Sequence, residues 1–281
     1  MRILLTGADG FTGRHFTAHA EAAGHEIVPL RADLREADAV AQEVASSTAD
    51  AAVHLAAIAF VGHADERAFY DVNLFGTLNL LRGLKLAGRP WRKVLLASSA
   101  NVYGNCEQSP IPESQAPAPV NHYAMSKLAV EHMARARHPE LPLVITRPFN
   151  YTGPGQTLDF VIPKLVDHFR RRASRISLGN LHVRREYNDV RFVCDAYLRL
   201  LDASPGTWNV CTGRTHSFDE LLATLERLTG HHIEVQVDPA LVRPNEVHTL
   251  CGDPARLRQA IGELPACSLD DTLQWMLTAA Q

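Results

Sequence analysis

The sequence predicts an α/β protein with a doubly wound parallel sheet and a smaller C-terminal lobe. In the first half of the 281 residues, short aliphatic runs alternate with longer stretches of helical periodicity. This alternation is typical of βαβ units. The first aliphatic run also ends in a glycine-rich turn, which in such sheets opens the first helix.

Five runs are nearly continuous in apolar residues, as expected for strands that are buried on both faces of a parallel sheet. They cover residues 3–6, 26–30, 51–55, 93–97 and 143–146. Helical periodicity between them predicts helices at about residues 13–23, 35–46, 66–87 and 123–137. We therefore expect residues 1–150 to form the sheet domain.

Residues 151–281 contain shorter elements, because turns are marked at Gly153-Pro154-Gly155 and Asp238-Pro239. A helix at about 190–201 that leads to a strand at 208–211 predicts a segment, about 190–212, that returns to the main sheet. The remaining pieces, roughly 157–181 and 217–281, are expected to form the smaller lobe, which caps the sheet.

Composition excludes several classes of protein. A formal net charge of −3 offers no basic surface for nucleic acid. No apolar run reaches the roughly 18 residues that span a membrane, and the chain opens on a strand pattern rather than a signal peptide. Five cysteines without a Cys-x-x-Cys pair indicate reduced thiols and no metal site. We expect a cytoplasmic globular protein.

The glycine turn predicts a dinucleotide site. Gly7, Gly10 and Gly13 lie in Thr-Gly-Ala-Asp-Gly-Phe-Thr-Gly, directly after the first strand. Glycines at this spacing let a pyrophosphate approach the N-terminus of the helix, where free N–H groups and the helix dipole favour anions.

The end of the second predicted strand bears on the choice of dinucleotide. Asp33 lies about 20 residues beyond the last glycine, where an acid binds the ribose of NAD. The strand, however, ends at Leu30, so Arg31 occupies its tip and can meet a 2′-phosphate. Asp33 and Leu34 then face the adenine. We therefore favour NADP(H), with NAD(H) as the alternative.

Tyr123 and Lys127 form a Tyr-x-x-x-Lys pattern on one face of a predicted helix. A neighbouring ammonium favours the phenolate, so we expect the pKa of Tyr123 to lie below its usual value of about 10. Such a pair also occurs by chance on exposed helices. Ser98 and Ser99 make the catalytic interpretation stronger, because they end a buried strand at the crevice where doubly wound folds bind ligands.

Together these motifs resemble the extended short-chain dehydrogenase/reductase family, also called the NAD-dependent epimerase/dehydratase family, in its nucleotide-sugar-modifying branch. The matching segments cover nearly the whole chain: residues 6–13, 54–57, 73–77, 98–104, 123–127, 147–150, 153–156, 185–190 and 243–246. The resemblance implies a Rossmann sheet in which residues 1–150 bind the dinucleotide and residues 151–281 bind the substrate. It also implies that Ser99, Tyr123 and Lys127 are catalytic.

Two sets of binding residues are expected. Those expected at the cofactor are Gly7, Gly10, Phe11, Thr12, Gly13, Arg31, Asp33, Leu34, Leu55, Ala56, Ala57, Asn73, Ala97, Ser98, Tyr123, Lys127, Pro148 and Phe149. Those expected at a nucleotide-diphosphate sugar are Ser99, Asn101, Asn150, Asn180, Arg185, Arg243 and Glu246.

The residues after Ser99 bear on the reaction. Family members that are 4,6-dehydratases carry acidic residues there, whereas this chain has Ala100 and Asn101. Neither can take and return a proton, so water elimination is not expected, and a reductase or a 4-epimerase remains. Within the family, residues 149–156 and 184–191 look most like the GDP-4-keto-6-deoxy-D-mannose reductases. Two departures are Tyr151, where histidine is expected, and Glu186, where aspartate is usual.

The first hypothesis is therefore an NADP(H)-dependent reduction of the 4-keto group of a nucleotide-linked 6-deoxyhexose, GDP-4-keto-6-deoxy-D-mannose to GDP-D-rhamnose. A nucleotide-sugar 4-epimerase with tightly bound NAD is the alternative, and a non-catalytic dinucleotide-binding module is a further one. The resemblance also implies a homodimer paired through the helices at 66–87 and 123–137.

Overall fold

The apolar runs of the first half form one parallel sheet. Its strands are β1 (Arg2–Thr6), β2 (Glu26–Leu30), β3 (Ala51–His54), β4 (Lys93–Ala97), β5 (Leu143–Pro148) and β10 (Gly206–Val210). Their order is β10-β5-β4-β3-β1-β2, and each pairing is parallel. This computed structural model describes residues 1–242, 248–265 and 267–279. The doubly wound sheet that the sequence predicts is confirmed.

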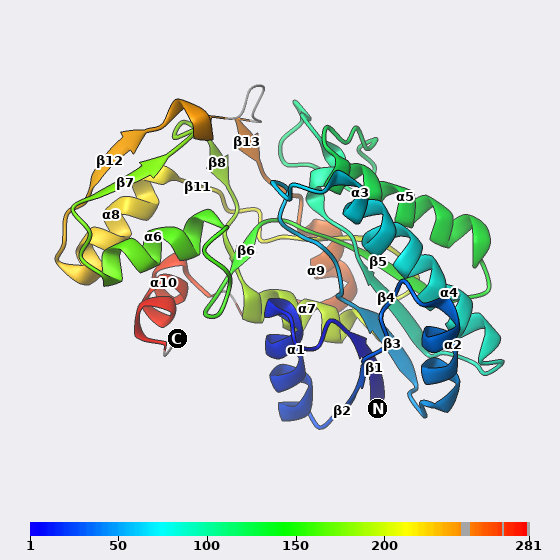
Figure 1. Cartoon of the computed structure of the whole chain (residues 1–281). Coiled ribbons are helices and arrows are strands. Elements are labelled where there is room, and N and C mark those ends of the chain that lie inside the picture. The colour runs from blue at the N-terminus through cyan, green and yellow to red at the C-terminus, as the bar shows by residue number, and fades with distance from the viewer. Residues whose placement is uncertain (243–247, 266, 280–281) are drawn as a thin grey trace.

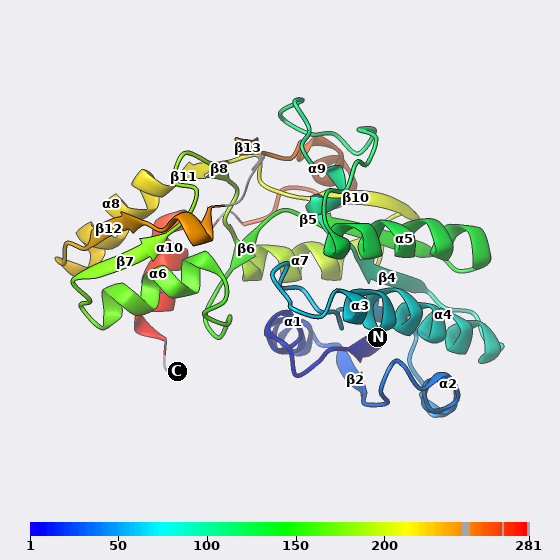
Figure 2. The same ribbon diagram turned by 45° about the horizontal axis from the view of Figure 1, so that its top comes forward.

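Helices cover both faces of the sheet (Figures 1 and 2). On one face lie α1 (Phe11–Ala22), α7 (Val190–Leu200) and α9 (Ala255–Ile261), and on the other lie α2 (Ala37–Ser46), α4 (Thr77–Leu86) and α5 (His122–Arg137). Side chains alternate along a strand. Ile3 and Leu5 therefore pack under α1 and α7, while Leu4 packs under α2 and α4.

The single helix predicted over residues 66–87 is interrupted. The chain forms α3 (Glu66–Ala68), a π-helix (η1, Phe69–Gly76) and then α4. The widened turns place the buried amide of Asn73 against the backbone of Ile58, with hydrogen bonds of 2.8 and 3.1 Å. Such π-helical segments are frequent at functional sites, and this one faces the carboxyl ends of the strands.

The second half forms a lobe with its own apolar core, beside the sheet in Figure 1. The core lies between α6 (Val161–Arg170), α8 (Phe218–Thr229), α10 (Leu269–Thr278), β7 (Arg175–Leu178) and β12 (Glu234–Val237). Short strands connect this lobe to the sheet domain. They are β6 (Tyr151–Thr152) paired with β9 (Asn188–Asp189), and β8 (Arg184–Arg185) between β11 (His216–Ser217) and β13 (Thr249–Leu250).

Glu186 joins these segments. Its buried carboxylate accepts hydrogen bonds from the backbone N–H groups of Thr212 at 2.8 Å and Gly252 at 2.6 Å, and from the Asn188 amide at 3.2 Å. Burial raises the pKa of Glu186, and these donors oppose the rise. The carboxylate thus ties the chain after β10 to the chain after β13.

Two glycines with similar positive φ angles differ in what an added side chain would meet. A Cβ at Gly104 (φ +61°) would lie 1.8 Å from the carbonyl oxygen of Ala118, whereas a Cβ at Gly88 (φ +62°) would have its nearest neighbour, the oxygen of Leu86, at 3.9 Å. We expect Gly104→Ala to lower the free energy of unfolding by about 3 kcal/mol or more. Gly88→Ala should cost only about 1 kcal/mol, from strain alone. Urea unfolding of both variants measures the difference, and equal losses would contradict this account.

Candidate active site

The glycine turn brings three backbone segments into close contact. A Cβ at Gly7 would lie 2.7 Å from the nitrogen of Ala56, and a Cβ at Gly13 would lie 2.0 Å from the oxygen of Gly7. Helix α1 begins after Gly10, and no side chain caps it. Its first N–H groups are therefore available to an anion. The crevice lies where the strand order reverses between β1 and β3, the usual ligand position in such sheets.

A directed chain of hydrogen bonds holds β1, β3 and η1 together. The Thr77 hydroxyl donates to the carbonyl oxygen of Asn73 at 2.5 Å, so its oxygen must accept from Nε2–H of His54 at 2.7 Å. Nδ1 of His54 then accepts from the Thr6 hydroxyl at 2.6 Å, and Thr6 accepts from the N–H of Ala56 at 3.2 Å. His54 is thereby fixed as the neutral Nε2–H tautomer, and it sets the backbone of residues 55–57 at the crevice.

Ser99, Tyr123 and Lys127 converge at the carboxyl end of β4. Ser99 follows this strand, its hydroxyl accepts from the N–H of Asn101 at 3.2 Å, and it lies close enough to Tyr123 to lower the pKa of the phenol against the effect of burial. Tyr123 and Lys127 lie one turn apart on α5, whose N-cap Asn121 accepts from the N–H of Ala124 at 2.8 Å. The Lys127 ammonium donates to the carbonyl oxygen of Ala97 at 2.8 Å. All three side chains are buried.

Burial is the main cause of the pKa shifts of Tyr123 and Lys127. The pKa of Tyr123 is raised by burial, with the Ser99 hydrogen bond opposing the rise. The pKa of Lys127 falls to about 8, because burial disfavours the ammonium more than Glu131 stabilises it. The expectation that the pKa of Tyr123 lies below its usual value is therefore wrong for this structure, because the loss of solvation is the largest effect on the phenol. Tyr123 is a protonated phenol at neutral pH.

The tip of β2 carries two arginines. Arg31 is exposed directly after β2, and the N–H groups of Arg31 and Ala32 donate to the Glu43 carboxylate at 2.8 and 2.7 Å. The Asp33 carboxylate is paired with Arg35, with contacts of 2.5 to 3.1 Å, which lowers the pKa of Asp33 to about 2. The Arg35 side chain was not predicted, although a basic residue two positions after Asp33 was a usable signal.

Other residues expected at the cofactor are engaged within the protein. The Ser98 hydroxyl donates to Glu131 at 2.6 Å, and Phe149 is fully buried beside Tyr103. Thr12 is hydrogen-bonded to Tyr151 at 2.8 Å. The side chains of Leu34 and Pro148 are also buried, while Phe11, Leu55, Ala56, Ala57 and Ala97 are half-buried at the crevice.

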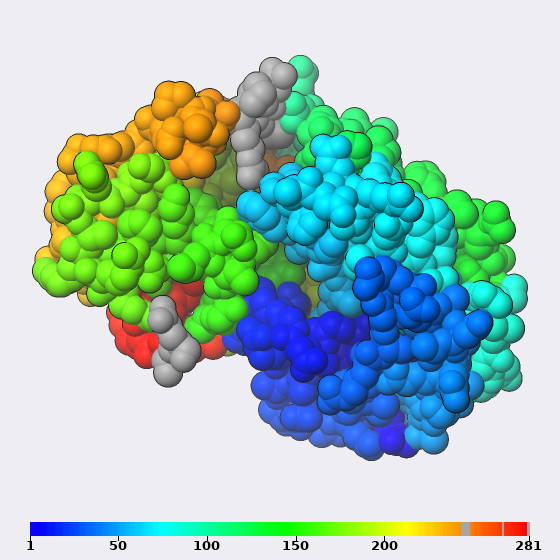
Figure 3. All heavy atoms as spheres, in the orientation of Figure 1, coloured from blue at the N-terminus to red at the C-terminus, as the bar shows by residue number. Residues whose placement is uncertain are grey.

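The residues expected at the substrate come from separate segments. Asn101 lies in the 3₁₀ turn η2 (Ala100–Tyr103) after Ser99, and Asn150 is exposed after β5. Asn180 follows β7, and Arg185 is buried in β8, where it donates to the carbonyl oxygen of Arg184 at 2.9 Å. The predictions for Arg243 and Glu246 lie outside the described residues. Figure 3 shows the surface hollowed where the blue and cyan segments of the sheet domain meet the green segments of the lobe.

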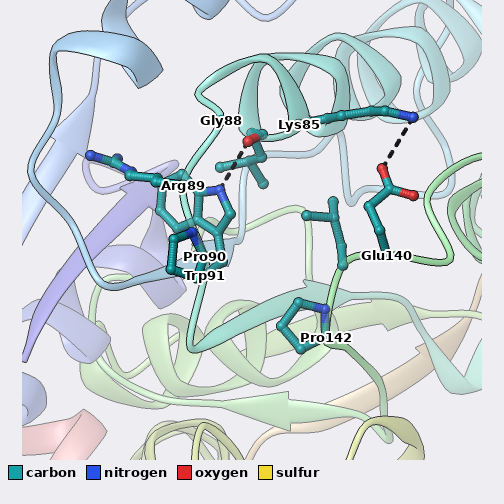
Figure 4. A pocket seen from close by; sticks show the side chains of 9 residues that line it. Lys85, Gly88, Arg89, Pro90, Trp91, Glu140 and Pro142 are labelled. Carbon is teal, nitrogen blue, oxygen red and sulfur yellow. Dashed lines mark hydrogen bonds and ion pairs between the residues drawn. The ribbon is translucent and has the colours of Figure 1, made fainter.

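Two other cavities lie away from this group. One, of about 450 Å³, is lined by Lys85, Trp91 and Glu140 near the amino ends of the strands, and Figure 4 shows the 3.3 Å pair between Lys85 and Glu140 there. The other, of about 420 Å³, lies among α7, α8 and α9. Neither is lined by Ser99, Tyr123 or Lys127. The described residues contain no cluster with metal-ligand composition, and none of their helices could cross a bilayer.

Comparison with known proteins agrees with this geometry. The model of the family described as GDP-mannose 4,6 dehydratase matches residues 14–276. The chain belongs to this family. Its name does not fix the reaction, because the relatives carry out several. The GDP-6-deoxy-D-mannose reductase of Pseudomonas aeruginosa is 35% identical over 99% of this chain and 96% of its own length. The GDP-6-deoxy-D-talose 4-dehydrogenase of Aggregatibacter actinomycetemcomitans is 34% identical over 93% and 92%.

Solved structures are also similar to this chain over nearly its full length. A Burkholderia cenocepacia protein described provisionally as an epimerase has a TM-score of 0.92 and 45% identity over 98% of this chain and 96% of its own. RMD from Pseudomonas aeruginosa, complexed with NADPH, has a TM-score of 0.91 and 34% identity over 99% and 97%. The chain is thus an oxidoreductase of the extended short-chain dehydrogenase/reductase type, as the sequence predicts.

The buried His54 generates a prediction about stability. Burial lowers its pKa from 6.5 to about 3. Between these values the unfolded chain binds the extra proton, so the free energy of unfolding falls with falling pH, by about 1.4 kcal/mol per pH unit from this residue. We expect His54→Gln, which keeps one donor and one acceptor, to remove this contribution. Urea unfolding at several pH values between about 4 and 7 measures how steeply the free energy of unfolding of each protein depends on pH. If the free energy of unfolding depends on pH equally in the wild type and in His54→Gln, the assignment of this pH dependence to His54 is contradicted.

Proposed function

We propose that this enzyme reduces the 4-keto group of a GDP-linked 6-deoxyhexose with NADPH, converting GDP-4-keto-6-deoxy-D-mannose to GDP-D-rhamnose. The observation that carries the proposal is the convergence of Ser99, Tyr123 and Lys127 beside the glycine turn. The relative named GDP-6-deoxy-D-mannose reductase, which matches almost the full chain, supports the substrate class. The absence of a carboxyl group at Ala100 and Asn101 favours reduction over water elimination.

The residues present fit a dinucleotide. The close approach at Gly7 and Gly13 leaves the uncapped start of α1 for the diphosphate. Residues 55–57, fixed through His54, would lie along the cofactor at the switch point, and Lys127 would bind the nicotinamide ribose. When bound, NADPH would supply the hydride.

Side chains of this protein would supply the proton that the substrate oxygen takes up during the reduction. Ser99 would donate a hydrogen bond to the substrate carbonyl and fix its orientation. Tyr123 is the acid, and its raised pKa keeps the proton available for the oxygen on which negative charge develops. The buried Lys127 ammonium stabilises the phenolate that remains. Because its pKa is about 8, this stabilisation weakens as the pH rises above that value.

The decisive experiment is NADPH oxidation with GDP-4-keto-6-deoxy-D-mannose, with the product identified by NMR. We expect turnover by the wild type and a loss of about 10²–10⁴-fold in Tyr123→Phe. NADPH binding, followed by its fluorescence, should be unchanged in the variant, because the phenol ring stays in place. Retained turnover would remove Tyr123 from its role, and a wild type inactive on this substrate would overturn the proposal.

The preference for NADPH rests on Arg31. Its guanidinium is exposed at the tip of β2, and Arg35 offsets the negative charge of Asp33. An arginine bound to a phosphate contributes about 1.5–3 kcal/mol. We therefore expect Arg31→Ala to raise the KM for NADPH by about 10- to 100-fold and to leave the KM for NADH unchanged. Arg137→Ala, an exposed arginine at the opposite end of the sheet, is the matched control. Tighter binding of NADH than NADPH by the wild type would defeat the assignment.

A 4-epimerase with tightly bound NAD is the second candidate. Asp33 at the ribose position and the provisional description of the Burkholderia cenocepacia protein favour it. The two candidates differ in the purified protein, since an epimerase retains a full complement of NAD and a reductase exchanges its cofactor with solution.

We also propose that the enzyme is a homodimer. Phe75 of η1 and Met125 of α5 are 56% and 44% exposed on neighbouring helices. The two elements pack against each other, and large apolar side chains that gather on one exposed surface are typical of interaction sites. They support the pairing through these helices that the family resemblance implies.

A further inference from the structure

The helix that carries Tyr123 and Lys127 also carries a buried carboxylate. Glu131 lies one turn beyond Lys127 on α5 and has no solvent exposure. It accepts a hydrogen bond from the Ser98 hydroxyl at 2.6 Å. It also accepts two from the guanidinium of Arg147 on β5, at 2.9 and 2.6 Å. Neither Glu131 nor Arg147 was expected from the sequence to have a role in the site.

Arg147 reaches the other end of the turn that contains Ser99. Its guanidinium lies over the ring of Tyr103, 4.8 Å from the ring centroid. The Tyr103 hydroxyl donates to Asn209 at 2.7 Å, and the Asn209 amide donates to the carbonyl oxygen of Ile111 at 2.9 Å. Residues 98–103 are therefore held at both ends, at Ser98 by Glu131 and at Tyr103 by Arg147.

We propose that the Glu131–Arg147 pair positions Ser99 against Tyr123. The pair links the turn 98–103 directly to the helix that bears the phenol, so the two hydroxyl groups cannot shift independently. Both members are positioning residues, because Ser98 and Tyr103 lie between them and the reacting atoms. This inference rests on the proposed reductase function.

Physical chemistry supports a functional interpretation over a purely stabilising one. A buried ion pair adds little stability compared with apolar side chains of the same volume. This pair instead provides three hydrogen bonds of defined direction, which join α5 to β5 and to Ser98 at the end of β4. Catalytic geometry is sensitive to such restraints, since a displacement of about 1 Å can cost about 10²-fold in rate.

The pair also influences the charge of Lys127. The groups that act on this ammonium are Glu131 on its own helix, His54 on β3, which is neutral, and the carbonyl oxygen of Ala97 on β4. The Glu131 carboxylate raises the pKa of Lys127 against the effect of burial. Loss of this negative charge should shift the alkaline limb of kcat/KM to lower pH.

The test uses two variants of different severity. Ser98→Ala breaks only the bond between Glu131 and the turn, and the fold should survive it. We expect kcat for the keto sugar to fall by about tenfold, with the Kd for NADPH unchanged.

Glu131→Gln keeps the shape of the side chain and removes its charge. We expect kcat to fall by about 100-fold. The alkaline decline of kcat/KM should begin at a lower pH than in the wild type. In the double variant, the loss in kcat should be smaller than the product of the two single losses, because both changes weaken the same hydrogen-bond network.

A matched control separates position from stability. Ser47 at the end of α2 is also a buried serine, and its hydroxyl donates to the carbonyl oxygen of Val44 at 2.9 Å and accepts from Arg89 at 2.8 Å. Ser47→Ala should lower the free energy of unfolding and leave kcat unchanged.

The outcomes are distinguishable. An inactive wild type overturns the proposed function and this inference with it. An active wild type with full kcat in Ser98→Ala overturns the inference alone. A weaker affinity for NADPH with unchanged kcat also overturns it, because Ser98 would then act on the cofactor. Lower kcat, unchanged NADPH binding and a shifted alkaline limb in Glu131→Gln support it.

Discussion

The site depends on how closely the first turn of the chain approaches β3. Any side chain at Gly7 would collide with the backbone of Ala56, and any side chain at Gly13 would collide with the oxygen of Gly7. This contact holds the start of α1 close to residues 55–57. Because His54 lies at the end of β3 and is bonded on both ring nitrogens, the backbone that follows it is fixed as well. The glycines thus allow the close approach, and the histidine restrains the strand end that takes part in it.

Burial then determines which protonation states this crevice can hold. His54 stays neutral, Tyr123 keeps its proton, and Lys127 is brought near the point of losing its own. All three shifts follow from the loss of solvation, which always disfavours the charged form. Among the described residues, the negative charge that opposes this for Lys127 is that of Glu131, one turn further along α5. A site built for proton donation therefore needs a buried anion behind it.

Local sequence signals predicted much of this arrangement. Continuous apolar runs gave the strands, the glycine spacing gave the turn, and the separation of Tyr123 and Lys127 placed both on one helix face. The remainder depends on tertiary contacts that no short pattern contains. The π-helix at Phe69–Gly76 goes with a contact between Asn73 and the backbone of Ile58, which lies 15 residues away in the sequence. The partners Glu131 and Arg147 lie on separate elements, and either one alone resembles an ordinary surface charge. The effect of burial on Tyr123 was likewise invisible, because spacing shows a neighbouring ammonium and not the lost solvent.

The contact between α1 and the lobe adds a constraint that links the two halves of the enzyme. Tyr151, at the start of β6, is hydrogen-bonded to Thr12 and stacks on Phe11 at 6.1 Å between ring centroids. One turn further along α1, His15 is 2.9 Å from the carbonyl oxygen of Pro154. These bonds join the helix whose N-terminus faces the crevice to the segment that leads into the lobe. A histidine at position 151, as the family resemblance suggested, would carry its polar atoms closer to its own backbone than a phenol does. The tyrosine spans the distance to Thr12 and so ties the segment that leads into the lobe to the start of α1.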